Sequence, residues 1–301
     1  MRVFDLHIGY SDSEIVSLPD APKQFDCLLA QQGGVEVFCG MMCPVVYENG
    51  AFALPSDSKS EVQKHIQIYE DLMKEGRLSI VYSRNDLKKK GLKVILGLEG
   101  AYFIRSEKDL EFLQESIDRG IRIIGPRWNF ESTLFPGNTM TSLGEKFLKL
   151  CSIHNIVIDL AHSENSIFNL VCNIYHGPII DSHTNLYSIR SHPRNIKSDQ
   201  MSVIIKRGGL IGISFVGEFL GGNRLFNVFQ NIKTFLDTFG DENLAIGSDF
   251  CGMDQSDVVN QLEDASKYNS LQTFLLKNGI GKQTVEKLLY NNADKFFRRI
   301  L

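Results

Sequence analysis

Polar residues that can bind a metal stand at the ends of several short apolar segments. The carboxyl ends of five such segments carry His7, Glu99, His162, His183 and Asp249. A single histidine in this position is usually just hydrogen-bonded, but these five residues share one position relative to their segments. Buried imidazoles and carboxylates are costly unless they have a partner, and a divalent cation can serve them all. Their placement predicts a metal centre of the catalytic kind.

The elements that would position these residues alternate between two patterns. Short apolar runs predict strands at 3–8, 35–46, 93–98, 121–128, 156–161, 178–183, 209–215 and 244–249. Amphipathic segments predict helices at 60–75, 107–119, 142–154, 165–175, 198–206, 226–239, 270–278 and 283–297. This alternation favours parallel strands in a closed (β/α)8 TIM-type barrel, whose carboxyl strand ends all meet on one face. A doubly wound sheet is the alternative, although the sequence has no GxGxxG or GxxxxGK(S/T) phosphate loop.

The composition is that of an ordinary globular protein. The 301 residues are 43% apolar and 23% charged, with a formal net charge of −4, so we expect one barrel domain over residues 1–301. No basic stripe indicates nucleic acid, and the run Lys88 to Lys90 is typical of a solvated helix end. No apolar run is long enough to span a bilayer. None of the six cysteines forms a CxxC pair, and with no signal peptide we expect reduced thiols in a cytoplasmic protein.

Several motifs resemble one known family along nearly the whole chain. They include Gly97-Leu98-Glu99-Gly100, the stretch from Val157 to Ser163, the stretch from Pro178 to His183, and Gly247-Ser248-Asp249-Phe250. In their types, order and spacing these motifs resemble the renal (membrane) dipeptidase family of zinc metallopeptidases, which are amidohydrolase-like barrels. The resemblance implies that the chain hydrolyses a dipeptide or a related small amide.

The resemblance also implies a binuclear zinc centre. Glu99 would bridge the two metals, His162 and His183 would complete one site, and His7 would belong to the other.

The same resemblance assigns two residues to the substrate. Arg194 would bind the substrate carboxylate, which a guanidinium fork suits, and Asp249 would carry protons to and from the reacting groups.

Three positions depart from the family's pattern. The first strand of the family reads His-x-Asp, and Gly9 replaces the aspartate that binds a metal. Asp12 is the nearest substitute. Trp128 stands where many members have a substrate-contacting histidine, so we expect it to line the substrate site. Cys251 replaces an aspartate, and we interpret it as a packed or exposed thiol rather than a ligand. We therefore expect one complete zinc site and an impaired second site.

Two functions follow from these patterns. The first is zinc-dependent hydrolysis of a dipeptide or a related small amide by a metal-activated water. The alternative is a diverged member that has lost peptidase activity and serves in binding or in a biosynthetic step, as Gly9 and Trp128 suggest. A lyase or isomerase on the same barrel has no motif in its favour. The resemblance also implies a homodimer as one form of assembly.

Overall fold

Eight parallel strands close into a barrel in the computed structural model of the chain. The structure describes residues 1–9, 23–48 and 51–301. The strands follow the order β2-β1-β11-β10-β9-β8-β7-β6, and β6 pairs back with β2. The barrel predicted from the sequence is confirmed, and the doubly wound alternative is wrong because the sheet has closed on itself. These strands are β1 (Val3–Ile8), β2 (Val35–Met42), β6 (Lys93–Glu99), β7 (Ile121–Gly125), β8 (Val157–Asp159), β9 (Ile179–Thr184), β10 (Leu210–Ile213) and β11 (Leu244–Ile246).

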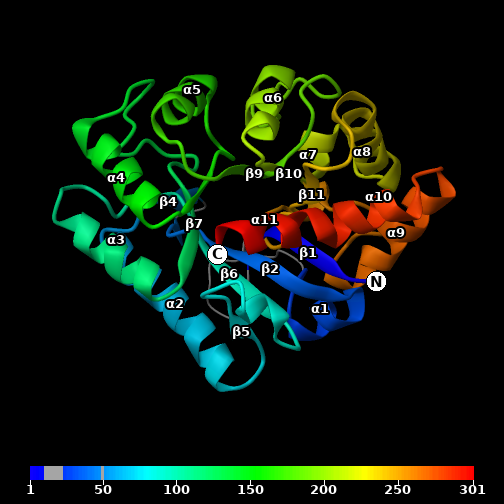
Figure 1. Cartoon of the computed structure of the whole chain (residues 1–301), viewed down its shortest axis with the longest axis horizontal. Coiled ribbons are helices and arrows are strands. Elements are labelled where there is room, and N and C mark those ends of the chain that lie inside the picture. Colours follow the sequence, from blue (N-terminus) through cyan, green and yellow to red (C-terminus); the bar gives the residue numbers. More distant parts are fainter. Residues whose placement is uncertain (10–22, 49–50) are drawn as a thin grey trace.

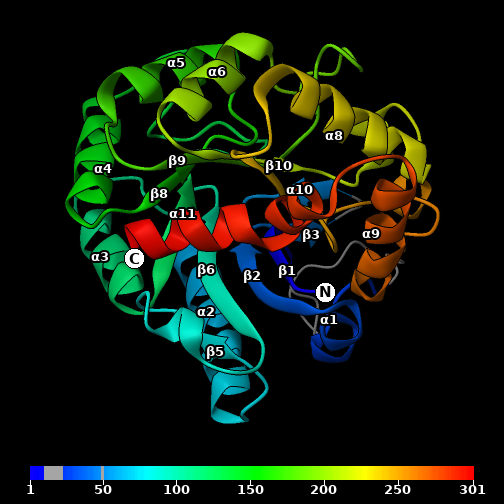
Figure 2. The same cartoon turned by 45° about the vertical axis from the view of Figure 1, so that its right-hand side comes forward.

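The helices surround the barrel (Figure 2). They are α1 (Cys27–Gly33), α2 (Ser58–Lys74), α3 (Asp109–Asp118), α4 (Ser142–Ile153), α5 (Asn165–Ile174), α6 (Ser198–Lys206), α7 (Gly217–Leu220), α8 (Leu225–Phe239), α9 (Tyr268–Lys277), α10 (Lys282–Glu286) and α11 (Asn292–Ile300). Each of the eight expected helices is present. The last one is not continuous, because a π-helical turn (η4, Lys287–Asn291) separates α10 from α11.

Short additional elements lie outside the expected pattern. The strand expected to continue to residue 46 ends at Met42, and β3 (Val46–Glu48) then pairs antiparallel with β4 (Ala51–Ala53). A two-residue strand, β5 (Ser79–Ile80), pairs with the start of β6. The strand expected over 121–128 ends at Gly125, which leaves Trp128 on the loop that follows.

A separate apolar cluster fills the interior of the barrel. Side chains from the starts of the strands pack against the C-terminal helix, and the ring of Phe4 stacks on the ring of Phe297 at a centroid distance of 5.2 Å. Figure 1 shows α11 lying across the barrel in front of β1 and β2. One end of the barrel is therefore closed by α11, and the carboxyl ends of the strands form the opposite end.

No disulfide joins any two of the six cysteines, and Cys39 and Cys151 are buried. Among the described residues, no helix is both long enough and apolar enough to cross a bilayer. Asp12, the expected substitute ligand, lies outside the described residues.

Candidate metal centre

The carboxyl ends of the strands bring the predicted ligands together. His7 lies on β1, Glu99 ends β6 and His183 lies on β9. His162 follows β8, and Asp249 follows β11. The φ angle is +63° at His162 and +64° at Asp249, in the left-handed region that residues other than glycine rarely adopt. Such strained backbone is typical of functional sites, and here it turns both side chains at the barrel mouth.

Three ligand atoms converge on the bottom of this mouth. The Oε1 atom of Glu99 lies 2.8 Å from His162 Nε2 and 3.5 Å from His183 Nε2, and the two Nε2 atoms are 3.1 Å apart. Ligand atoms that bind the same ion lie close together in this way, because the ligands of a tetrahedral site surround one common centre. Glu99, His162 and His183 thus form one group that could hold a metal.

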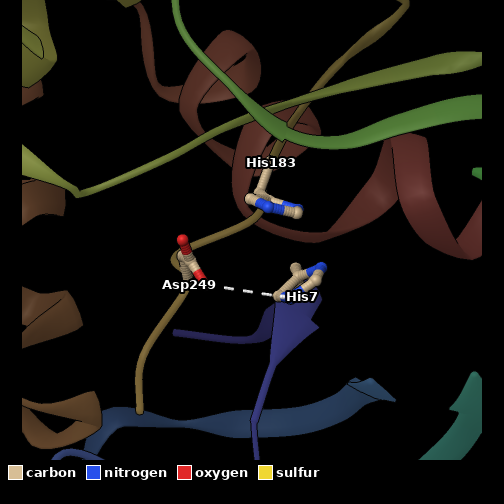
Figure 3. Close-up of side chains that lie close together, drawn as sticks. All are labelled: His7, His183 and Asp249. Atoms are coloured by element: carbon tan, nitrogen blue, oxygen red, sulfur yellow. Dashed lines mark ion pairs between the residues drawn. The ribbon is translucent and has the colours of Figure 1, made fainter. Parts of the chain in front are cut away.

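A second group shares one member with the first. His7, His183 and Asp249 offer ligand atoms that all lie within 4.8 Å of one another. Figure 3 shows the three side chains facing a common space, and its dashed line joins His7 Nε2 to Asp249 Oδ1 at 3.8 Å. His183 has only one free ring lone pair, so it can bind a single ion. If the first group takes it, a second ion has His7, Asp249 and the shared Glu99, whose Oε1 lies 3.6 Å from His7 Nε2.

One hydroxyl group sets the proton positions on two of the histidine rings. Ser182 Oγ donates to Asp159 Oδ2 at 2.6 Å, so its only hydrogen is used there. The Nδ1 atoms of His7 and His183, both 2.9 Å from the same Oγ, must therefore donate to it. The Nε2 lone pairs of both rings are consequently free of hydrogen and face the mouth, as metal binding requires. Ser182 was not singled out in the sequence, although it directly precedes His183.

The third histidine is oriented by the neighbouring loop. His162 Nδ1 lies 2.9 Å from Asn129 Oδ1, an acceptor that keeps the hydrogen on Nδ1. That loop is held by the hydroxyl of Tyr102, which accepts from Trp128 N at 2.6 Å and Phe130 N at 3.1 Å. The hydroxyl also donates to Phe130 O at 2.9 Å. Asn129 and Tyr102 are further residues that sequence reasoning missed, because only the fold brings them to the site.

The electrostatics of the site favour a cation. Burial lowers the pKa of His7 to about 3 and the pKa values of His162 and His183 well below their usual range, and repulsion from Arg194 adds to this effect. Burial, together with Asp249, raises the pKa of Glu99 well above its usual range. A divalent cation would offset this effect and keep Glu99 ionised, so neutral imidazoles with free lone pairs beside this carboxyl group are a donor set that a divalent metal fits.

Arg194 and Trp128 form one side of the mouth. Arg194 Nη2 donates to His183 Nε2 at 2.7 Å, so this hydrogen bond and a metal would use the same lone pair. The Trp128 ring lies 5.9 Å from the His162 ring and 5.5 Å from the Phe52 ring of β4. All seven predicted site residues line one cavity of about 370 Å³: His7, Glu99, Trp128, His162, His183, Arg194 and Asp249.

Gly9 lies at the edge of the same cavity. A Cβ atom on Gly9 would meet its nearest neighbour, Cys251 Cβ, at 3.6 Å, which is ordinary van der Waals contact. The backbone therefore has room for a larger residue. Cys251 also lines the cavity, but it belongs to neither group of candidate ligands.

Comparison with known proteins places the chain in a family. The model of the membrane dipeptidase family (peptidase family M19) matches residues 12–300. The chain belongs to the membrane dipeptidase family. This family is the one that the motifs in the sequence resemble.

Two relatives match most of this chain but differ in how much of their own length is matched. An uncharacterized protein in the pqqA 5' region of Klebsiella pneumoniae is 26% identical over 82% of this chain and 99% of its own length. Dipeptidase 3 of Rattus norvegicus is 27% identical over 69% of this chain, which spans only 45% of that longer protein.

Two solved structures share the fold over the whole chain. The structure of dipeptidase AC, a metallopeptidase, has a TM-score of 0.86 at 19% identity and covers 100% of this chain and 98% of its own. A metallopeptidase from Rhodobacter sphaeroides, liganded with a phosphinate mimic of the dipeptide L-Ala-D-Ala, has a TM-score of 0.85 at 19% identity and covers 100% and 99%.

Proposed function

We propose that this chain is a zinc-dependent hydrolase of dipeptides or of closely related small amides. The observation that carries the proposal is the convergence of Glu99 Oε1, His162 Nε2 and His183 Nε2 within 3.5 Å of one another at the barrel mouth. Two imidazoles and one carboxylate make the three-ligand set of known catalytic zinc sites, which leave one position for water or substrate.

The residues around this set would divide the work of hydrolysis. A bound zinc ion supplies an activated water and polarises the scissile carbonyl. Burial raises the pKa of Asp249 to about 7, so this carboxylate can accept a proton near neutral pH and return it to the leaving amine. Arg194 would exchange its hydrogen bond with His183 for the substrate carboxylate, and Trp128 would pack against the substrate beside it.

The experiment combines metal content with turnover. The purified protein should contain about one zinc per chain or slightly more and should hydrolyse members of a dipeptide panel at neutral pH. His183→Ala should remove both properties, since His183 belongs to both ligand groups. His176→Ala, which changes an exposed histidine, should keep both. A wild-type protein that binds no metal and turns over no dipeptide would refute the proposal.

Gly9 favours a second candidate function. Gly9 supplies no carboxylate, so a second metal would have one ligand fewer than an aspartate at this position would give it, and the chain could serve as a binding or biosynthetic protein with no peptidase activity. Specific, saturable binding of dipeptides by the zinc-loaded protein without turnover would identify this case.

The proposal also covers the domain, the cellular compartment and the oligomeric state. We propose one catalytic domain over residues 1–301 that acts in a reducing compartment such as the cytoplasm, because no disulfide joins any two of its six cysteines. A homodimer is the proposed assembly. Light scattering at micromolar concentration tests it, and a mass of one chain would contradict it.

A further inference from the structure

A second large hollow lies at the opposite end of the barrel from the metal centre. It has a volume of about 710 Å³ and is lined where β1, β2 and β6 begin. The loop that follows η1 (Asp86–Lys88) and Arg298 of α11 complete its wall. The hollow is assembled from segments far apart in the sequence, so its composition is a property of the fold rather than of one charged run.

Positive charge is concentrated in this hollow. The cationic residues of its lining are Arg2, Arg77, Lys93, Arg298 and the run from Lys88 to Lys90, and the one acid in the lining is Glu36. The whole chain, in contrast, has a net charge of −4. The lysine run, which the sequence alone indicates to be a solvated helix end, thus lies at the edge of a concave basic surface.

Part of this charge is neutralised within the protein. Arg2 forms a two-bond pair with Glu36 at 2.8 and 2.9 Å. Lys89 pairs with Asp86 at 2.8 Å, and Arg298 pairs with Asp294 at 2.7 Å.

Three lysines remain without such a partner. Within residues 1–9, 23–48 and 51–301, no carboxylate lies within ion-pair distance of Lys88, Lys90 or Lys93. These three ammonium groups supply the excess positive charge of the hollow.

The most deeply placed of these lysines is held by the backbone. Lys93 is only 2% exposed, and its Nζ donates to Lys89 O at 3.0 Å and to Gly91 O at 2.8 Å. Burial lowers the pKa of Lys93, and Arg2 and Arg298 act in the same direction. An ammonium group has three donors, so one donor of Lys93 remains for another acceptor. The cost of holding these like charges together would be relieved by an anion.

We propose that this hollow binds a small anion that carries several phosphate groups. Each terminal phosphate group offers three acceptor oxygens and more than one negative charge, which matches a set of lysine and arginine donors better than a single carboxylate does. The described lining contains no aromatic ring, so recognition rests on charge and not on the stacking of a base. The site is remote from the metal centre, and the inference does not depend on the proposed peptidase activity.

The test is calorimetric titration of the full-length protein with orthophosphate, pyrophosphate and tripolyphosphate at about 0.15 M salt. We expect affinity to increase with the number of phosphate groups and to fall at higher salt. The double variant Lys88→Glu and Lys90→Glu should weaken tripolyphosphate binding by about tenfold or more, because two attractive charges become repulsive. ATP should bind about as well as tripolyphosphate.

Two control variants distinguish binding in this hollow from a general effect of net charge and from binding in the metal cavity. The exposed lysines 277 and 282, changed to Lys277→Glu and Lys282→Glu, alter the net charge equally but lie outside the lining, so this variant should bind like the wild type. Arg194→Met removes the guanidinium of the metal cavity and should also leave binding intact. The proposal is overturned if the wild type does not bind tripolyphosphate, if orthophosphate binds equally well, or if either control weakens binding as much as the test variant.

Discussion

The Ser182 hydroxyl connects the two halves of the candidate metal centre. It accepts from both His7 and His183 and donates to Asp159, so its full hydrogen-bonding capacity is used. A residue that binds no metal thereby decides whether two ligand lone pairs are available. Outer partners of this kind commonly change metal affinity by one to two orders of magnitude.

Replacement of Ser182 by alanine tests this role. Ser182→Ala should lower zinc affinity about 10- to 100-fold, because both imidazoles lose the acceptor that keeps their hydrogens on Nδ1. Competition with a chromogenic chelator measures the affinity. Ser202→Ala, at an exposed position on α6, is the control. Equal affinities of both variants would show that the hydroxyl does not position the ligands.

Gly9 offers the converse test, in which a ligand is added. Gly9→Asp should raise the zinc content from about one toward two per chain, since the Cβ has room at 3.6 Å from Cys251 Cβ and a carboxylate would join His7. Elemental analysis after dialysis measures the stoichiometry. Gly9→Ala fills the same space without a ligand and should leave the stoichiometry unchanged. An aspartate variant that binds no more zinc than the alanine variant would exclude a site at His7.

At the scale of elements, Tyr102 fixes the loop that follows β7. Tyr102→Phe should lower the free energy of unfolding by about 1 to 3 kcal/mol, because two backbone N–H groups lose their acceptor. Zinc affinity should fall as well, since Asn129 on this loop orients His162. Urea unfolding and chelator competition measure the two effects. Tyr82→Phe, at an exposed tyrosine, should have neither effect, and a loss of stability with unchanged zinc affinity would separate the loop from the site.

Helix α2 carries a histidine that should make the protein sensitive to acid. His65 is buried, its Nδ1 has no hydrogen-bond partner among the described residues, and burial lowers its pKa from 6.5 to about 4. Between these values the unfolded chain binds a proton that the folded chain does not, so stability falls as the pH decreases from 6.5 to 4. The loss amounts to about 3 kcal/mol over this range.

The prediction is measured as a difference between proteins, because other groups titrate in the same range. His65→Gln should lose less stability than the wild type between pH 7 and pH 4.5 in urea unfolding, by about 2 to 3 kcal/mol. His176→Gln changes an exposed histidine and should follow the wild type. Parallel curves for His65→Gln and the wild type would contradict a buried, neutral His65.

The elements were predictable where their pattern is regular. Eight apolar runs and eight amphipathic segments have the periodicities of strands and helices, and all sixteen elements are present. The hairpin of β3 and β4 has strands of three residues, too short for a pattern. Helix α1 was not predicted, although the sequence has a typical capping residue at each of its ends. The Asp26 side chain accepts a hydrogen bond from Leu29 N at the start, and Gly34 adopts a left-handed conformation after the end.

The candidate site was predictable only in part, because some of its contacts join residues that are distant in the sequence. The ends of predicted strands indicate all five candidate ligands, because a barrel gathers such ends on one face: His7, Glu99, His162, His183 and Asp249. The contacts of Ser182, Asn129 and Tyr102 join residues that are distant in the sequence. No local pattern encodes such contacts, and they emerged only from the folded chain.

At the scale of the whole molecule, the candidate metal centre links elements from all around the barrel. The candidate ligands lie on β1, β6 and β9 and just after β8 and β11. Zinc should therefore stabilise the entire fold. At a free zinc concentration of roughly a hundred times the Kd, the expected gain is about 2.7 kcal/mol.

Metal removal tests this linkage. A chelator should lower the Tm of the wild-type protein in calorimetry, and added zinc should restore it. His183→Ala, which lacks the shared ligand, should melt at the same temperature with and without the chelator. If the Tm of the wild-type protein does not change with the chelator, bound metal does not contribute to the stability of the barrel.

Helix α11 has a consequence for how the barrel is made in the cell. The interior residues of β1, among them Phe4 and Leu6, pack in the cluster that Phe296 and Phe297 of α11 help to form. These partners are separated by almost the whole length of the sequence, so β1 leaves the ribosome long before α11 is synthesised. Until α11 has been synthesised, the end of the barrel that it covers exposes aromatic and aliphatic side chains. The nascent chain is therefore expected to need a chaperone, and slower translation should lengthen its period of risk.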